Sequence, residues 1–469
     1  MAKEELSPMM KLYMATKEEY PDCILFYRLG DFYEMFFEDA KIASRELELT
    51  LTGKSCGLSE RAPMSGVPHH SASNYIEKLV SKGYKVAICE QVEDPKASSG
   101  LVKRDVVRVV TSGTLSDENM LSDKVNNYLA VCCAENDFGM AFCDISTGEI
   151  YVTSAETPND AIGEIARYSP REILLNPEGG VVLSRDLNLK LSLSSEVMDE
   201  DFFMDDTAKK HFGSNADSLK PSQEYALSGL IKYLVRTQKN TLDFIKNITL
   251  YSKKEFMEID AQSRRSLEIT ETMRDKSQKG SLLGVLDRTE TAMGARRLRQ
   301  WTEKPLLNIT EIQKRLFAVS ELYKTPILRQ ELRHTLSGIY DISRILTRVL
   351  LKTVSPKDMA SLRESLKMFP QLKSLLGETK SGLLKTFFEN FDTLDDICFL
   401  LERGIYESPS ISVKDGKVIC DGFSPELDEL RSLKENAHFY ITSSEERERE
   451  RTDFAANLSS VYIFRLISQ

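Results

Sequence analysis

The 469-residue sequence contains no C-x-x-C pair, and its five histidines are scattered along the chain. Structural zinc sites usually need closely spaced cysteine and histidine pairs, so a zinc-dependent protein is not expected. No apolar run is long enough to span a bilayer, and the first residues lack the apolar core of a secretory signal. We therefore expect a cytoplasmic protein whose eight cysteines are reduced and packed.

The sequence also lacks an excess of positive charge. Its formal net charge is −10, which argues against a protein that binds nucleic acid over its whole surface, so any DNA contact must use local basic patches. A P-loop for nucleotide phosphates is missing as well. Gly53-Lys54-Ser55 has the right ending, but Glu48 stands where the first glycine of G-x-x-x-x-G-K-[ST] belongs. We expect no nucleotide hydrolysis and no catalytic residue in this chain.

What the chain does contain is typical of folded domains. The hydrophobic share is 41% and the charged share is 29%. The length suggests about three domains. Strand and helix patterns alternate in the first half, whereas helical periodicity dominates the second half. The sequence therefore predicts a multi-domain α/β protein that continues into an all-α part.

The most informative run is FYRLGDFYEMFFEDA, at residues 26–40. It predicts a strand, a turn at Gly30 and a helix that begins at Asp31. Asp31 and Glu34 fit a capping box at the start of that helix. On this interpretation Phe32 is an ordinary aromatic side chain of the first helical turn.

The same residues fit a second interpretation, in which the aromatic side chain faces DNA. An apolar side chain that enters the minor groove unstacks a base step and kinks the duplex. The cost is lowest where base pairing is already faulty. Phe32 would then act as a wedge and Glu34 would hydrogen-bond the displaced base. The carboxylate of Glu34 would also repel the phosphates of an intact duplex.

The run GDFYE at residues 30–34 resembles the F-x-E mismatch-recognition motif of the MutS family. Three further runs resemble the same family: Ala62–His70 (APMSGVPHH), Val86–Pro95 and Val106–Thr114. The resemblance implies recognition of mispaired bases, with Phe32 stacked on the base and Glu34 hydrogen-bonded to it. Met64, in what we expect to be a loop, would touch the groove beside the wedge.

Basic residues of this segment are candidates for phosphate contacts, which would supply the salt-dependent part of DNA affinity. The candidates are Arg28, Lys54, Lys96, Lys103, Arg104 and Arg108. The resemblance implies DNA contacts at Lys54 and Arg104 in particular. Each residue alone is more typical of a solvated surface charge, so the prediction depends on clustering around Phe32.

The middle of the chain resembles the MutS connector domain through Phe142–Glu149 (FCDISTGE), which implies an RNase-H-like fold. Such a fold leaves a metal-dependent nuclease open as an alternative, because Asp144, Glu149 and Asp160 are acids near predicted strands. Their spacing does not show that they converge. A protein-interaction scaffold that binds repair partners without DNA is the other alternative.

The helical part resembles the family's core and lever through Met257–Ile269 and Gly280–Leu298. Four arginines in these runs have a composition suited to DNA, but interleaved acids favour ion pairs along or between helices. These arginines are Arg264, Arg265, Arg296 and Arg297. Further on, EERERER at residues 445–451 fits the entry into the family's clamp.

The resemblance predicts five segments. They are a mismatch-recognition domain at 1–114, a connector at 124–243, a helical core and lever at 254–430, the start of a clamp at 431–452 and an unmatched tail at 453–469. Family members continue into an ATPase domain that uses ATP and Mg²⁺, form dimers and work with MutL. We therefore expect a truncated form that binds mismatched DNA weakly and holds no cofactor; a broken reading frame would explain its tail.

Overall fold

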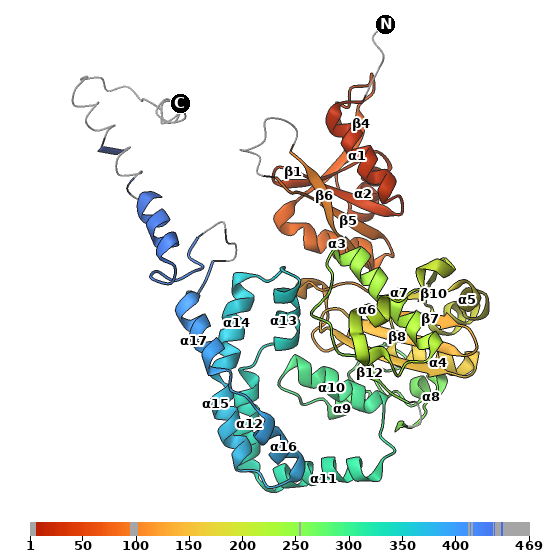
Figure 1. Ribbon diagram of the computed structural model, residues 1–469, viewed down its shortest axis with the longest axis vertical. Helices are drawn as coiled ribbons and strands as arrows, with labels where there is room; N and C mark the ends of the chain where they lie inside the picture. The colour runs from red at the N-terminus through yellow and green to blue at the C-terminus, as the bar shows by residue number, and fades with distance from the viewer. Residues whose placement is uncertain are drawn as a thin grey trace. The chain divides into compact units, whose positions relative to one another are not determined.

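The computed structural model describes residues 6–93, 102–252, 255–410, 413, 416–434, 436 and 442–443 (Figure 1). The chain divides into two compact units, Met1–Val354 with Met368–Asp392 and Ser355–Lys367 with Thr393–Gln469. Two six-stranded sheets come first, and helices dominate the described residues after them. The prediction of an α/β protein that continues into a helical part is confirmed. No helix of the described residues is both long enough and apolar enough to cross a membrane.

The first sheet has the strand order β3-β4-β2-β1-β5-β6. Its strands are β1 (Cys23–Leu29), β2 (Phe32–Phe36), β3 (Thr52–Lys54), β4 (Ala62–Pro68), β5 (Lys85–Gln91) and β6 (Arg104–Val110). One face packs against α1 (Pro8–Glu19), and the other packs against α2 (Phe37–Leu47) and α3 (Ala72–Ser81). Each face therefore has its own apolar core.

The predicted helix beginning at Asp31 is wrong. Residues 32–36 form strand β2, which pairs with β1 through the two-residue turn Gly30-Asp31, and α2 begins only at Phe37. Tyr33 is buried while Phe32 is exposed, which is the alternation of a strand. Gly30 adopts φ +60, as tight hairpin turns require. The capping box predicted for Asp31 and Glu34 is therefore absent.

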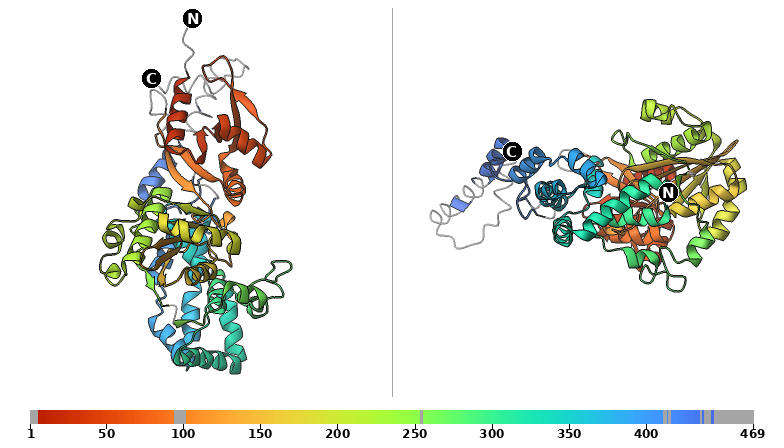
Figure 2. Two further views of the ribbon diagram at one scale, coloured as in Figure 1. Left: turned by 90° about the vertical axis from the view of Figure 1, so that its right-hand side faces the viewer. Right: turned by 90° about the horizontal axis from the view of Figure 1, so that it is seen from below.

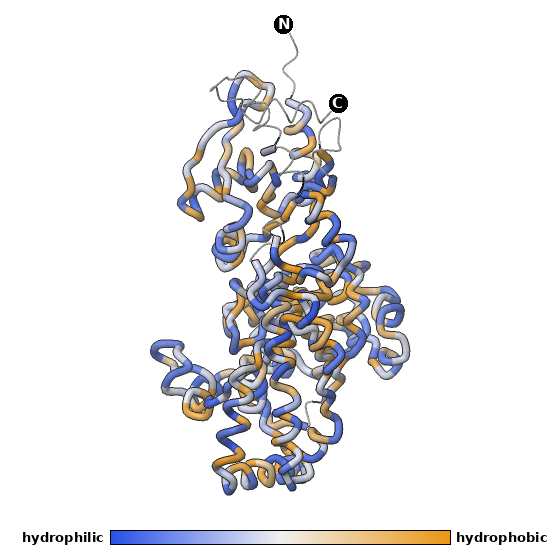
Figure 3. The backbone as a smooth tube through the Cα atoms, turned by 90° about the vertical axis from the view of Figure 1, so that its left-hand side faces the viewer, coloured by the Kyte–Doolittle hydropathy of each residue, from blue (hydrophilic) through white to orange (hydrophobic). Residues whose placement is uncertain are grey.

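The second sheet has the strand order β11-β10-β7-β8-β9-β12, with an antiparallel meander β7-β8-β9 at its centre. Its strands are β7 (Leu129–Ala134), β8 (Phe138–Asp144), β9 (Glu149–Ala155), β10 (Glu172–Leu175), β11 (Ser195–Val197) and β12 (Thr249–Leu250). Helices α4 (Pro158–Tyr168) and α5 (Pro177–Leu191) cover one face; α6 (Thr207–Phe212) and α7 (Pro221–Gln238) cover the other (Figures 1 and 2). Apolar positions, orange in Figure 3, gather inside the domain.

Helices follow from residue 261. The first unit contains α8 (Ala261–Ser266), α9 (Leu282–Leu286), α10 (Ala292–Glu303), α11 (Ile309–Lys324), α12 (Pro326–Ser337), α13 (Ile342–Leu350), α15 (Phe369–Gly377) and α16 (Gly382–Asn390). The second unit contains α14 (Pro356–Lys367), α17 (Asp395–Gly404) and helical residues 425–434. Most of the predicted clamp start and the whole tail 453–469 lie outside the described residues.

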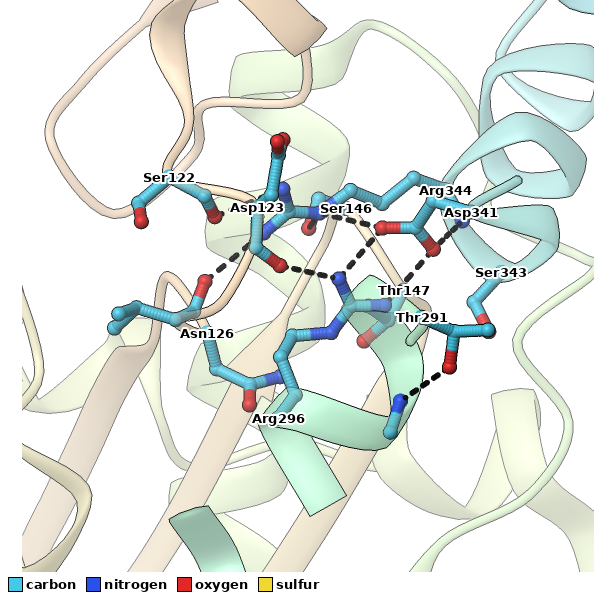
Figure 4. A network of polar contacts seen from close by, with 12 residues as sticks. Ser122, Asp123, Asn126, Ser146, Thr147, Thr291, Arg296, Asp341, Ser343 and Arg344 are labelled. Carbon is cyan, nitrogen blue, oxygen red and sulfur yellow. Dashed lines mark hydrogen bonds and ion pairs between the residues drawn. The ribbon is translucent and has the colours of Figure 1, made fainter. Parts of the chain in front are cut away.

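A buried arginine of α13 fastens the segment between the two α/β domains (Figure 4). Arg344 is 2% exposed and donates to the carbonyl oxygens of Ser122 at 3.0 Å and Val125 at 2.9 Å. It also donates to Ser146 Oγ, at 3.2 Å, in the turn after β8. A guanidinium suits this task because its donors lie in a fixed plane and point in several directions.

A second buried arginine completes the junction. Arg296 of α10 donates to the carbonyl oxygen of Asp123 at 2.9 Å and to the two carboxylate oxygens of Asp341 at 2.6 and 2.9 Å (Figure 4). Burial acts to raise the pKa of Asp341, but the hydrogen bond and charge of Arg296 outweigh it, so that pKa is lowered. The predicted role in an ion pair is thus confirmed for Arg296.

Candidate nucleic-acid interface

Phe32 stands at the tip of the β1–β2 hairpin with its side chain toward solvent. It is the first residue of β2, pairs with Leu29 and Pro68 across the sheet, and is 48% exposed. The backbone nitrogen of His69 donates to the carbonyl oxygen of Asp31 at 2.9 Å, which ties the turn to the end of β4. An exposed aromatic ring is therefore mounted on backbone that is hydrogen-bonded on both sides.

Glu34 lies two residues further along β2, so its side chain is on the same face as Phe32. Its carboxylate accepts a hydrogen bond from Lys54 Nζ of β3 at 2.5 Å. The residue of β4 opposite Glu34 is Gly66, where an added Cβ would lie 3.6 Å from Glu34 Cγ. Gly66 thus keeps the space beside Glu34 open. Sequence reasoning missed it, although a glycine inside a strand pattern often marks a close approach.

Met64 lies in strand β4 and not in a loop, so that part of the prediction is wrong. Its strand pairs with β2 on one side and β3 on the other, which fixes Met64 opposite Phe36 and Thr52. The side chain is partly buried against the core beneath α1. Met64 therefore lies in the strand next to β2, which carries Glu34.

The strand register separates the predicted basic residues onto two faces. Residues that pair across neighbouring strands point to the same side of a sheet. On this basis Lys54 and Arg104 share the face of Phe32 and Glu34. Arg28 pairs with Tyr33 and Arg108 with Ile88, which places both arginines on the opposite face.

The two arginines of the opposite face are engaged inside the domain. Arg28 is 9% exposed, donates to the carbonyl oxygen of Gly30 and lies 5.5 Å from the Tyr33 ring centroid. Arg108 is equally buried and pairs with Asp117 at 3.2 Å. Arg28 stabilises the hairpin turn, and Arg108 stabilises the segment that follows β6. Neither arginine lies on the face of the sheet that carries Phe32.

Arg104 lies at the same end of the sheet as the hairpin tip. It donates to the carbonyl oxygens of Arg28 at 2.8 Å and Val102 at 2.9 Å, and its guanidinium lies 5.3 Å from the Tyr27 ring centroid. Lys103, beside it, is exposed. The predicted Lys96 lies outside the described residues. The structure therefore brings together Phe32, Glu34, Lys54 and Arg104, with Lys103 exposed next to Arg104 in the sequence. This is a smaller set than predicted.

The three acids considered for a nuclease do not meet in one site. Asp144 is fully buried, and its carboxylate accepts hydrogen bonds from Asn126 Nδ2, the Asn127 backbone nitrogen and Ser146. Glu149 pairs with Asp144 across the β8–β9 hairpin, whereas Asp160 is bonded to Thr157 at the start of α4. The described residues contain no group of three or more acids, histidines or cysteines placed to hold a metal ion.

Comparison with known proteins gives three consecutive family matches: MutS domain I over residues 7–119, MutS domain II over 126–248 and MutS domain III over 262–466. A "DNA mismatch repair protein MutS" from Clostridium tetani is 47% identical over 456 residues, which is 96% of this chain and 51% of the relative. The protein of that name from Lachnoclostridium phytofermentans is 46% identical over 96% of this chain and 49% of its own length. The chain thus spans about half the length of these relatives.

Proposed function

Because this chain belongs to the MutS family, we propose that its first α/β domain recognises mispaired or unpaired bases in duplex DNA. The observation that carries the proposal is Phe32, an exposed aromatic side chain at the tip of a hairpin whose backbone is fixed. Exposed apolar residues at such a tip favour insertion between base pairs. The proposal assigns recognition to this domain. We propose in addition that the whole chain binds mismatched DNA weakly.

The free energies involved explain how one aromatic ring distinguishes mispaired from fully paired duplex. Burying a Phe side chain gains roughly 1.5–3 kcal/mol. Unstacking and unpairing a base step costs a few kcal/mol in intact duplex and less at a defect. The two terms nearly cancel on paired DNA, so insertion of Phe32 becomes favourable only where pairing is already weak. No base-specific contact is needed for this preference.

Glu34 and Lys54 act as a unit in this proposal. The Glu34 carboxylate would accept a hydrogen bond from the displaced base, while its ion pair with Lys54 offsets part of the repulsion from phosphates. Lys54, Lys103 and Arg104 are the proposed phosphate contacts, since they surround Phe32 or are exposed near it. Arg28 and Arg108 lie on the opposite face of the sheet, whereas Met64 lies opposite Phe36 on the face that carries Glu34.

Phe32→Ala is expected to weaken binding to a duplex with a G·T mismatch or one unpaired T by about tenfold or more, since roughly 1.4 kcal/mol corresponds to tenfold. Binding to the perfectly paired twin should change little. Fluorescence anisotropy of labelled duplexes at two salt concentrations measures both. Phe317→Ala is the matched control, because Phe317 is 68% exposed on α11 and far along the chain from the hairpin. Equal preference in parent and Phe32→Ala protein would overturn the proposal.

Glu34→Ala is expected to raise affinity for fully paired duplex while reducing the preference for mismatched duplex. The substitution removes a negative charge near the phosphates and releases Lys54 from its ion pair. The same anisotropy titration tests it, with Glu38→Ala as control because Glu38 is a solvated acid that pairs only with Lys41 among the described residues. A loss of affinity for both duplexes alike would show that Glu34 supports the fold instead.

We propose three further properties on the family relationship alone. The segments 1–114, 124–243 and 254–430 are the proposed domains, with 431–452 entering a clamp and 453–469 following it. Dimer formation and a MutL-type partner are proposed for the whole protein, as is a location in the cytoplasm. Use of ATP and Mg²⁺ would belong to family regions outside the three matched domains.

A further inference from the structure

A cavity of about 620 Å³ lies between the second α/β domain and the first helices of the helical part. Its walls come from the end of α4 with the turn before β10, the end of α5, α8 with the loop after it, and the end of α10. Small-molecule sites usually measure roughly 300–1,000 Å³, so the cavity has the size of a ligand site. It lies within one compact unit and is separate from the Phe32 hairpin.

The lining of this cavity is strongly basic although the chain is acidic overall. Two lining acids, Glu271 and Glu303, face a larger group of cations. The cations are Arg171, Lys190, Arg264, Arg265, Lys276 and Arg299. Glu303 is paired with Arg299 at 3.0 Å and Lys190 with Asp186 at 2.8 Å. Four lining cations then remain against the single lining acid Glu271. In a chain with net charge −10, such a local excess points to an anion.

Three of these cations are exposed and free to contact a ligand. Within the ranges that the structure covers, the side chains of Arg171, Arg265 and Lys276 make no hydrogen bond or ion pair. Arg171 comes from the turn before β10, whereas Arg265 and Lys276 come from α8 and the loop after it, and all three line one cavity. Cations that converge from separate segments suit a ligand with several negative charges, and guanidinium groups bind phosphate oxygens in pairs.

Two further cations are largely buried: Arg264 in the wall itself, and Lys304, which packs on the lining residue Tyr168. Arg264 is 9% exposed and donates to the carbonyl oxygen of Ala166 at 3.0 Å, while its Nε is buried with no hydrogen-bond partner. Burial lowers the pKa of Arg264 by more than the charge of Glu303 raises it, and the nearby Arg167 lowers it further. The Lys304 ammonium lies 3.5 Å from the Tyr168 ring centroid, and burial lowers its pKa to about 7. The nearby carboxylates of Glu303 and Glu164 offset part of this buried charge. The exposed cations of the wall, and not these buried groups, would therefore supply the contacts to an anion.

We propose that this cavity binds a chain of phosphates, as in inorganic tripolyphosphate or the polyphosphate of a nucleotide, through Arg171, Arg265 and Lys276. The inference does not rest on mismatch recognition, because no residue of the Phe32 hairpin lines the cavity. Bound phosphates would bridge the second α/β domain and the helices. Such a ligand would also raise the stability of the folded chain by mass action.

Isothermal titration calorimetry of the full chain with tripolyphosphate at constant ionic strength tests the proposal. Saturable binding to one site is expected, and Arg265→Glu and Lys276→Glu should each weaken it at least about tenfold. The matched control is Arg274→Glu, since the Arg274 side chain is 94% exposed in the same loop but does not line the cavity. That control should bind as the parent does. Circular dichroism of each variant shows whether it remains folded.

A second arm compares ATP with tripolyphosphate. Equal affinity identifies the phosphate chain as the whole ligand, whereas tighter binding of ATP adds a contact between base and cavity wall. Absence of saturable binding, equal weakening by Arg274→Glu, or displacement of tripolyphosphate by a short paired duplex would each overturn the proposal. Phe32→Ala should bind tripolyphosphate unchanged, so failure here is distinguishable from failure of mismatch recognition.

Discussion

Arg296→Met lowers the free energy of unfolding by about 3–5 kcal/mol, the range expected when one partner of a buried ion pair is removed. The substitution removes the donor to the carbonyl oxygen of Asp123 and two hydrogen bonds to the Asp341 carboxylate. That carboxylate keeps the Arg344 backbone nitrogen at 3.3 Å and the Arg344 side chain at 3.8 Å. Arg296 is only 4% exposed, so water cannot simply replace the guanidinium. Urea denaturation followed by circular dichroism measures the loss.

The neighbouring residue provides a matched control. Arg297 is exposed, and its side chain donates to Gln300 of its own helix at 3.2 Å. Arg297→Met removes the same charge from the same helix but should change stability by no more than about 0.5 kcal/mol. Equal losses in the two variants would show that net charge matters and that the buried contacts of Arg296 do not.

The dependence on pH separates the ion pair from simple packing. The Asp341 pKa lies below its usual 3.8 because the hydrogen bond and charge of Arg296 outweigh burial. A carboxyl with a lowered folded pKa adds stability above its ordinary pKa and loses it as the pH falls through the folded value. The stability gap between parent and Arg296→Met should therefore narrow as the pH falls below about 4. A constant gap would assign the effect to lost packing.

Local patterns were enough to predict an α/β part followed by a helical part. Strands β7 and β8 of the meander are apolar and buried along almost their whole length, and β9 has a mixed pattern. Thr147-Gly148 lies in the tight turn between β8 and β9. The family motifs likewise identify Phe32 and Glu34 without a structure. Such signals are carried by short stretches of chain, and for this reason they can be read before the fold is known.

The helix wrongly predicted to begin at Asp31 shows what a local sequence pattern cannot decide. The residues Phe32–Phe36 contain apolar side chains that fit either a helical or a strand period over so short a span. The choice is made by β4, whose Val67 pairs with Tyr33 across the sheet. A partner strand that distant in the sequence contributes nothing to a local pattern, so tertiary pairing overrode the apparent helix signal.

The arginines of β6 show a second limit. Arg104 and Arg108 are four residues apart, which would place them on one face of a regular strand. The pairing of β5 with β6 shifts between Ile88 and Cys89, and this irregularity turns Arg108 to the opposite face. A single extra residue thus decides which arginine shares the face of Phe32. The hydrogen bonds of Arg296 and Arg344 to the segment between the α/β domains could not be predicted from the sequence either, because their partners are distant along the chain.

Gly139→Ala is expected to lower the free energy of unfolding by about 3 kcal/mol, at the upper end of the usual cost of overpacking. A Cβ at residue 139 would lie 2.1 Å from the backbone carbon and oxygen of Ser222, at the start of α7. These are main-chain atoms, so no side-chain rotation can relieve the clash. The whole helix would have to move away from the central strand of the meander.

Gly163→Ala makes the same chemical change with the opposite expected sign. Nothing lies within 4 Å of a Cβ at residue 163, and the residue is inside helix α4, where alanine is favoured over glycine by roughly 0.5–1 kcal/mol. Urea denaturation of the two variants therefore tests the close contact between α7 and β8 directly. A neutral Gly139→Ala would contradict that contact.

A displacement of α7 would also disturb the hydrogen bonds that hold the first α/β domain. Tyr233 of α7 donates to the buried carboxylate of Glu172, which accepts a second hydrogen bond from Thr111 and a third from the Gly113 backbone nitrogen, at 2.9 Å. Thr111 and Gly113 directly follow strand β6, so α7 helps to anchor the domain that carries Phe32. Gly139→Ala should therefore reduce the preference for mismatched duplex at temperatures where the protein is still folded, although residue 139 contacts no proposed DNA-binding residue. An unchanged preference in anisotropy titrations would show that the first domain recognises DNA independently of its anchor.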